Sequence, residues 1–202
     1  ATSGFSRGEG GSGHRAAGSD AERLGCGRGL VASELRVDVL SWGFALASQL
    51  SRYKVLILPA VCVLSREEVL LFSSWAENGG RLIVSANASG LQELLGLETS
   101  GKIEARGACN YLTTSADAPS WLGFAPSELL PDWTRALVVT ECGASTLARF
   151  HEPTFGQYNP LSPLSHAAIL HHQIGSGETI FFAGNIGETY ADYGLPALKK
   201  LM

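Results

Sequence analysis

The sequence lacks the features that mark several large classes of protein. It has no uninterrupted run of the roughly 20 apolar residues that a membrane-spanning helix needs, and its longest apolar runs, Val55–Leu58 and Ala60–Leu64, are only the length of a strand. It also lacks a basic excess, since 15 Lys and Arg stand against 19 Asp and Glu. A nucleic-acid-binding face is basic. We therefore expect neither a membrane nor a nucleic acid as a partner.

Cysteine and methionine are sparse. The four cysteines lie far apart and form no C-x-x-C pair: Cys26, Cys62, Cys109 and Cys142. We expect them to be thiols in a reducing, cytoplasmic compartment, with disulfide pairing as the alternative. The chain opens on Ala1 without the basic and apolar segments of a signal peptide, and its only methionine is Met202. We interpret it as a fragment of a longer product or as an incomplete gene product.

The composition changes near residue 25. Residues 1–24 are rich in Gly, Ser, Ala and Arg and show almost no apolar periodicity. Such a segment cannot bury enough surface to offset its ordering entropy. We expect residues 1–24 to be a disordered or non-native leader and residues 25–202 to form one domain, which is the usual outcome for a chain of this length.

The clearest local pattern predicts a strand, a helix and a second strand. Val55–Leu58 is a continuous apolar run, which is typical of a parallel strand buried on both faces. Ser65 and Glu68 have the spacing of a capping box, and apolar residues then recur at helical spacing until the glycine pair at 79–80. Arg81–Ser85 predicts the next strand. This βαβ unit places the chain in the α/β class.

The other expected elements are less regular. Residues 119–132 should be mostly loop, and residues 151–166 are too proline-rich for a helix or a central strand. We expect a helix end at Leu30–Leu35, a strand at Val37–Leu40, a short helix at Leu91–Leu95, strands at Lys102–Cys109 and Leu137–Glu141, a hairpin of Ala167–Gln173 with Thr179–Ala183, and a closing helix at Pro196–Leu201.

The order and spacing of these motifs over residues 27–202 resemble a known family, the β-galactosidase trimerisation domain. The likeness is carried by these segments: Tyr53–Pro59, Leu64-Ser65, Asn78–Ser85, Leu94-Leu95-Gly96, Tyr111-Leu112, Ser165-His166, Gly175–Ala183, Tyr190 and Tyr193-Gly194. In family 42 β-galactosidases and related glycoside hydrolases this domain follows the catalytic barrel.

The resemblance implies a fold and a role. The fold would be a flavodoxin-like, class I glutamine amidotransferase-like three-layer sandwich with a mainly parallel central sheet. The role would be subunit contact in a trimer. The barrel that carries the two catalytic carboxylates would be missing from this chain, and no cofactor is implied.

Enzymes of this fold place a Cys nucleophile at the sharp turn after a strand and a His after a late strand. A nucleophile needs such a base and an oxyanion hole of backbone N–H groups. The turn at Ala86–Gly90 contains no Cys, and no His lies around residue 185. We therefore expect no catalytic residues and predict only a degenerate pocket formed by Cys62, Ser85, Asn87 and Asn185.

Cys62 leaves two interpretations open. It lies just beyond the Val55–Leu58 strand, at the end where α/β sheets bind ligands. A reactive thiolate needs a positive neighbour, and Arg66 is the only basic residue nearby in sequence. The favoured interpretation is a small, partly buried apolar side chain.

Histidine-based metal binding is not favoured. His151, Glu152 and His166 could supply ligands to zinc, but they have no fixed ligand spacing, and hydrogen bonds that fix loops are the preferred interpretation. His171 and His172 are adjacent on an expected strand, so they point to opposite faces. We therefore expect no metal. The scattered acidic residues likewise select no pair for glycoside hydrolysis.

Three functions remain. The first is a non-catalytic accessory or oligomerisation domain of a β-galactosidase-like glycoside hydrolase, partnered by a catalytic barrel or by identical subunits. Exposed Trp121, Phe124 and Trp133 could form that contact. The second is a carbohydrate-binding or sensing domain in which the same aromatic residues line a sugar platform. The third is a small amidotransferase-like hydrolase that uses Cys62 or Ser85.

Overall fold

The computed structural model describes residues 18–40, 46–59, 64–103, 110–116, 118–122, 128–151 and 163–194. The helices are α1 (Gly18–Ala32), α2 (Leu46–Leu50), α3 (Arg66–Glu77), α4 (Gln92–Leu95) and α5 (Ile186–Tyr193), with a 3₁₀ turn at Ser120–Leu122. The strands are β1 (Val55–Pro59), β2 (Arg81–Ser85), β3 (Leu97–Ile103), β4 (Asn110–Thr114), β5 (Leu130–Asp132), β6 (Ala136–Glu141), β7 (Ser145–His151), β8 (Pro163–Ile174) and β9 (Gly177–Phe182).

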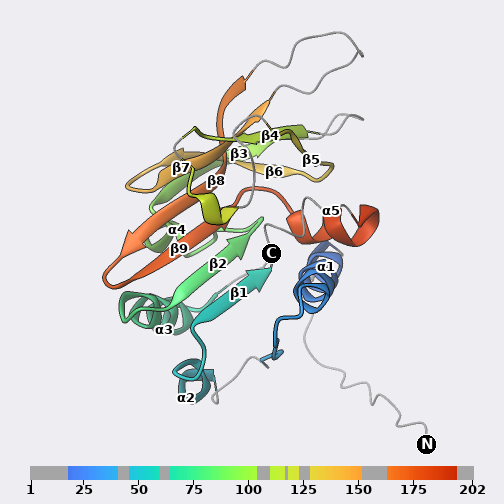
Figure 1. Ribbon diagram of the computed structural model, residues 1–202. Helices are drawn as coiled ribbons and strands as arrows, with labels where there is room; N and C mark the ends of the chain where they lie inside the picture. The colour runs from blue at the N-terminus through green and yellow to red at the C-terminus, as the bar shows by residue number, and fades with distance from the viewer. Residues whose placement is uncertain are drawn as a thin grey trace, which may run out of the picture.

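A seven-stranded sheet in the order β1-β2-β9-β8-β7-β4-β5 forms the centre of the molecule. Figure 1 shows that it curls along its length, with the small β3–β6 sheet beside it. Helix α3 packs against β2 and β9. The core contains the fully buried Phe72 of α3, Leu82 of β2, Ile169 of β8 and Phe181 of β9. The chain is therefore of the α/β class, as expected.

The predicted βαβ unit is confirmed. Strands β1 and β2 pair in parallel, with Val55 opposite Arg81, and α3 connects them. The capping box is present at its start: the Glu68 N–H donates to the Ser65 hydroxyl at 3.2 Å, and the Ser65 N–H donates to the Glu68 carboxylate at 2.7 Å. One detail differs, because β1 is an edge strand and Val55 is exposed rather than buried.

The expectation of a mainly parallel sheet is wrong for the described residues. Parallel pairing is limited to β1–β2 and β2–β9, whereas β9–β8, β8–β7, β7–β4 and β4–β5 are all antiparallel. The reason is connectivity. A tight turn at Gly175-Ser176 joins β8 to β9, and between β4 and β9 the described residues contain no α-helix that could serve as a parallel crossover. A flavodoxin-like three-layer sandwich is therefore not established.

The N-terminal expectation needs correction as well. Helix α1 begins at Gly18, so residues 18–24 are helical, and the expected boundary between leader and domain falls inside this helix. Residues 1–17 lie outside the described part of the chain. The error arose because α1 buries no row of apolar residues at helical spacing that periodicity could detect. Its buried side is formed instead by Glu22, Gly25 and Leu30, and Figure 1 shows α1 running beside α5.

Several smaller predictions differ from the structure. Residues 37–40 have no regular secondary structure and pair with no strand, so the expected strand does not form there. Pro163 opens the central strand β8, where a first-position proline removes no hydrogen bond from the middle of the ladder. Strand β3 begins at Leu97, earlier than expected, and residues 104–109 lie outside the description. The expected helix at Pro196–Leu201 also lies outside it, and α5 was not predicted.

Candidate functional site

Helix α1 packs against one face of the parallel strands, from Ile57 and Ile83 in their middle to Ser85 at the end of β2. The cavity that remains there is lined by Glu22, Cys26 and Leu30 of α1, by Ser85 and its apolar strand neighbours, and by the first turn of α5. Its volume is about 30 Å³. That is enough for a water molecule or two and far below the volume of a ligand pocket.

Glu22 is the centre of this closed region, which we call the Glu22 cluster (Glu22, Cys26, Ser85 and the Glu188 N–H). Its buried carboxylate accepts the Ser85 hydroxyl at 2.6 Å and the backbone N–H of Glu188 at 2.6 Å. Burial raises the pKa of Glu22, and the hydrogen bonds from Ser85 and Glu188 oppose that rise. The N-cap residue of α5, Asn185, makes no side-chain cap bond. Glu22 therefore caps α5 from another helix.

The thiol of Cys26 belongs to the same cluster. Its Sγ lies 3.7 Å from a Glu22 carboxylate oxygen. Burial, followed by the negative charge of Glu22, raises the pKa of the Cys26 thiol far above its ordinary value. A thiol in such surroundings stays protonated and is a poor nucleophile.

The turn after β2 has the sharp geometry expected of a nucleophile position, but it carries a methyl group. Ala86 has a φ of 58°, in the left-handed region that residues other than glycine seldom adopt. Its N–H donates to the Phe182 carbonyl at 2.9 Å, which ties the turn to β9. The next residue, Asn87, accepts the Ser89 N–H at 2.9 Å in a local turn.

The described residues of the predicted degenerate pocket take part in different contacts. Ser85 lies in the Glu22 cluster, Asn87 contacts its own loop, and Asn185 begins α5. Cys62 lies outside the described residues. Sequence reasoning missed Glu22, because it falls in the segment taken as a leader and no spacing pattern marks it.

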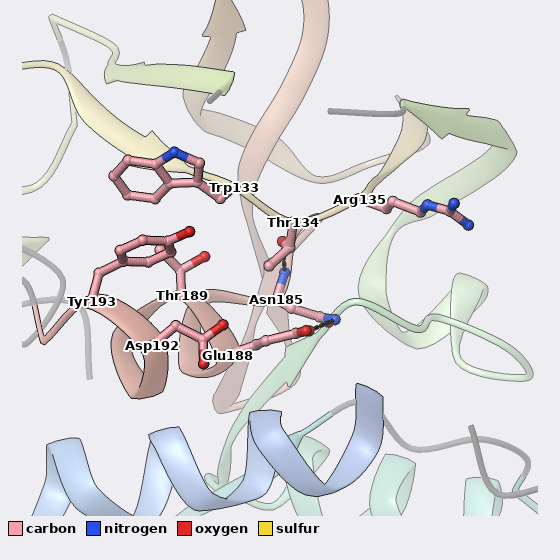
Figure 2. A pocket seen from close by; sticks show the side chains of 8 residues that line it. All are labelled: Trp133, Thr134, Arg135, Asn185, Glu188, Thr189, Asp192 and Tyr193. Carbon is pink, nitrogen blue, oxygen red and sulfur yellow. Dashed lines mark hydrogen bonds between the residues drawn. The ribbon is translucent and has the colours of Figure 1, made fainter. Parts of the chain in front are cut away.

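An open hollow lies on the other side of the first turn of α5 (Figure 2). Its volume is about 320 Å³. The residues that line it come from the β5–β6 connection and from α5: Trp133, Thr134, Arg135, Asn185, Glu188, Thr189, Asp192 and Tyr193. The rings of Trp133 and Tyr193 are stacked, with centroids 4.2 Å apart and planes at 29°. Of the aromatic residues expected to form a surface, Trp133 alone is described with its side chain.

A buried carboxylate holds the two walls of this hollow together. Asp132 Oδ1 accepts the backbone N–H of Thr134 at 2.9 Å, the Thr134 hydroxyl at 2.7 Å and the Thr189 hydroxyl at 3.0 Å. Thr134 in turn accepts the Asn185 N–H at 2.9 Å. Burial raises the pKa of Asp132, and the bonds from Thr134 and Thr189 lower it. This network fixes β5 against α5.

Three of the described histidines take part in ordinary hydrogen bonds, whereas Glu152 of the proposed metal set lies outside the described residues. His151 pairs with the Thr113 hydroxyl at 2.8 Å, His171 with Glu178 at 2.7 Å, and His172 with the Leu94 carbonyl at 3.0 Å. Within the described ranges there is no group of three or more His, Cys, Asp or Glu side chains that could hold a metal ion. In the same part of the chain, no helix is both long and apolar enough to cross a membrane.

No known protein-family model matches this sequence. No curated protein matches it either. Solved structures do. A GH42 β-galactosidase from G. stearothermophilus has a TM-score of 0.65 at 18% identity, over 96% of this chain and 27% of that chain. The α-L-fucosidase isoenzyme 2 from Paenibacillus thiaminolyticus has a TM-score of 0.65 at 21% identity, over 90% of this chain and 28% of that chain.

A third structure is a protein of similar size. A cytoplasmic protein from Salmonella typhimurium has a TM-score of 0.64 at 10% identity, over 88% of this chain and 82% of that chain. At these identities the likeness is one of fold. The fold is shared with one part of glycoside hydrolase chains, and this chain spans only 27% and 28% of the length of the two hydrolases above.

Proposed function

We propose that this chain is a non-catalytic accessory domain of a glycoside-hydrolase-related protein, equivalent to a β-galactosidase trimerisation domain, which contacts a catalytic barrel or further copies of itself. The observation that carries the proposal is that α1 covers Ser85 at the end of β2. Ser85 stands where a ligand would approach a parallel sheet, but its hydroxyl is bonded to the buried Glu22. A cavity of about 30 Å³ leaves no room for a substrate there.

Two further features support the absence of catalysis. The sharp turn after β2 presents Ala86, whose methyl group has no nucleophilic atom. The thiol of Cys26, which belongs to the Glu22 cluster, has a strongly raised pKa. The likeness to only a quarter of the hydrolase chains fits a domain that works beside a separate catalytic unit.

An apolar surface on α1 and the segment after it supports a partner contact. Its exposed side chains, which we call the α1 stripe, are Leu24, Val31, Leu35, Val37 and Val39. Val31 is 68% exposed and Val39 is 95% exposed. Large apolar side chains exposed at several positions of one segment mark a candidate contact site. In this proposal the stripe is covered by the barrel or by another subunit.

The cellular location belongs to the same proposal. Cys26 and Cys142 are free thiols, and the Salmonella typhimurium protein of similar fold is described as cytoplasmic. Both observations support a cytoplasmic location for this chain.

Self-association provides the first test. Sedimentation velocity at increasing protein concentration should show a defined oligomer, and Val39→Asp should weaken it because a buried charge opposes an apolar contact. Leu70→Asp is the matched control, since Leu70 is 60% exposed on α3, outside the stripe. If the wild type stays monomeric at about 100 μM, well above the micromolar range of specific contacts, the oligomerisation role fails.

A turnover screen tests the other half of the proposal. Aryl glycosides, esters and glutamine should all remain unhydrolysed. Turnover that disappears in Ser85→Ala would contradict the non-catalytic role and would favour the small-hydrolase alternative.

A further inference from the structure

We propose that the hollow between Trp133 and α5 is a binding site for a neutral saccharide, with room for one monosaccharide unit. The proposal concerns a different face of α5 from the Glu22 cluster. It does not depend on the accessory role, because a saccharide site could serve a catalytic or a non-catalytic protein.

The size of the hollow suits a small molecule. The volume of about 320 Å³ lies at the lower end of the range for small-molecule sites. It suits a ligand of roughly a dozen non-hydrogen atoms and excludes a folded partner. Figure 2 shows Trp133 above Tyr193 and Thr134 above Asn185, whereas the Arg135 side chain extends away from the other residues.

The aromatic wall suits the apolar face of a pyranose ring. Trp133 is 37% exposed and Tyr193 is 52% exposed, although each has a large apolar ring. The two rings stack on each other, so the outer face of each ring remains open to a ligand and the contact between them fixes both rings. The C–H groups on one face of a sugar ring pack on such a surface, while the indole N–H and the phenol O–H stay available at its rim.

The polar lining decides the charge of the ligand. Glu188 and Asp192 are four residues apart and therefore lie on the same face of α5. Arg135 borders the hollow at the end farthest from Tyr193 (Figure 2). Two carboxylates oppose an anion, whereas the Arg135 guanidinium extends away from the hollow, and Arg135 takes part in another interaction. Sugar hydroxyls can donate to the two carboxylates.

Several of these polar groups are available to a ligand. Within the described residues, the indole N–H of Trp133, the hydroxyl of Tyr193 and the carboxylate of Asp192 make no hydrogen bond. Glu188 uses only Oε2, which accepts from the Asn185 amide at 2.8 Å. That bond also fixes the Glu188 side chain against the start of α5.

The site is held in shape before any ligand arrives. Trp133 lies between Asp132 and Thr134, and both neighbours belong to the network that joins β5 to Thr189 of α5. A wall fixed in this way loses little conformational entropy on binding. The position of the aromatic pair relative to Asp192 is therefore set by the fold.

Binding to the intact chain can be measured by isothermal titration calorimetry and by saturation-transfer NMR. The probes are methyl β-D-galactopyranoside and methyl α-D-glucopyranoside, with tetramethylammonium and inorganic phosphate as the cationic and anionic alternatives. We expect at least one glycoside to bind with a Kd of about 1 mM, equivalent to about 4 kcal/mol. Binding of tetramethylammonium or phosphate in place of both glycosides would overturn the proposal.

Variants locate the site. Trp133→Ala should weaken glycoside binding at least about tenfold, which is about 1.4 kcal/mol, and Asp192→Asn should weaken it several-fold while keeping the shape of the side chain. The controls are Leu129→Ala and Glu93→Gln, two exposed positions outside the lining. Urea midpoints should show that the variants remain folded. Absence of glycoside binding at about 50 mM, or binding unchanged in Trp133→Ala and Asp192→Asn, overturns the proposal.

Discussion

Replacing Gly25 by alanine should push α1 away from α5. The Cβ atom of an alanine at this position would lie 1.6 Å from the Gly187 carbonyl oxygen and 2.3 Å from its carbon. Both are backbone atoms, so no flexible side chain can turn aside. The same substitution at Gly27, two residues further along α1, meets nothing within 4 Å. The two substitutions therefore test the same amino-acid change at two positions of one helix, one with a clash and one without.

The size of the effect follows from the contacts. An ordinary carbon–oxygen contact is about 3.3 Å, so the helices must separate by roughly 1.7 Å if the alanine is to fit. That separation would break the 2.6 Å bond from the Glu188 N–H to Glu22, a charged hydrogen bond of about 1.5–3 kcal/mol. Strain from overpacking adds about 1–3 kcal/mol, and helix propensity returns about 1 kcal/mol. The net destabilisation expected for Gly25→Ala is about 1.5–5 kcal/mol.

Equilibrium urea unfolding, followed by circular dichroism, measures the difference. Gly27→Ala should be stabilised by up to about 1 kcal/mol, because alanine is the better helix former. The close crossing of α1 and α5 would be refuted if the unfolding free energies of Gly25→Ala and Gly27→Ala agreed within about 0.5 kcal/mol, the usual scatter of surface substitutions. Such agreement would also restore the expectation that residues 18–24 are not part of the folded domain.

The remaining predictions concern the two buried carboxylates. Because burial raises the folded-state pKa of Glu22 above its ordinary 4.5, the folded state binds the proton more tightly than the unfolded state. The free energy of unfolding of the wild type, minus that of Glu22→Gln, should therefore increase as the pH falls from that raised pKa towards 4.5. Urea titrations at several pH values measure this difference. A difference that stays constant across this pH window would count against a buried carboxylate. At Gly184, an alanine Cβ would lie 2.0 Å from Asp132 Oδ2, so Gly184→Ala should lose about 2–4 kcal/mol of stability. Gly101→Ala, which meets nothing within 4 Å, is its control in the same unfolding assay, and equal stabilities would show that the Asp132 carboxylate can move aside.

The βαβ unit could be predicted because its signals are local. The Ser65–Glu68 capping box uses atoms three residues apart, and its geometry is found as the spacing predicts. The apolar runs at Val55–Leu58 and Arg81–Ser85 form the strands they predict. In each case the stabilising interaction lies within a few residues of the pattern that reveals it.

The antiparallel half of the sheet could not be predicted in this way. The pairings of β7 with β8 and of β4 with β5 depend on which strands meet in space, and a short apolar strand carries the same pattern in either orientation. Because the sequence pattern does not reveal strand orientation, the expectation of a mainly parallel sheet came from the family resemblance. Helix α1 escaped detection for a related reason, since what holds it is the tertiary hydrogen bonding of Glu22 and the contact at Gly25.

The first turn of α5 connects the Glu22 cluster with the hollow beside Trp133, a connection that no sequence pattern predicts. The backbone N–H of Glu188 binds Glu22 in the closed cluster, whereas its side chain lines the open hollow. A change that moves α1 therefore reaches the hollow through a single residue. If Gly25→Ala displaces the start of α5, it should also weaken glycoside binding, although Gly25 does not line the hollow. The Gly27→Ala protein should bind as the wild type does, which separates this effect from a general change in α1.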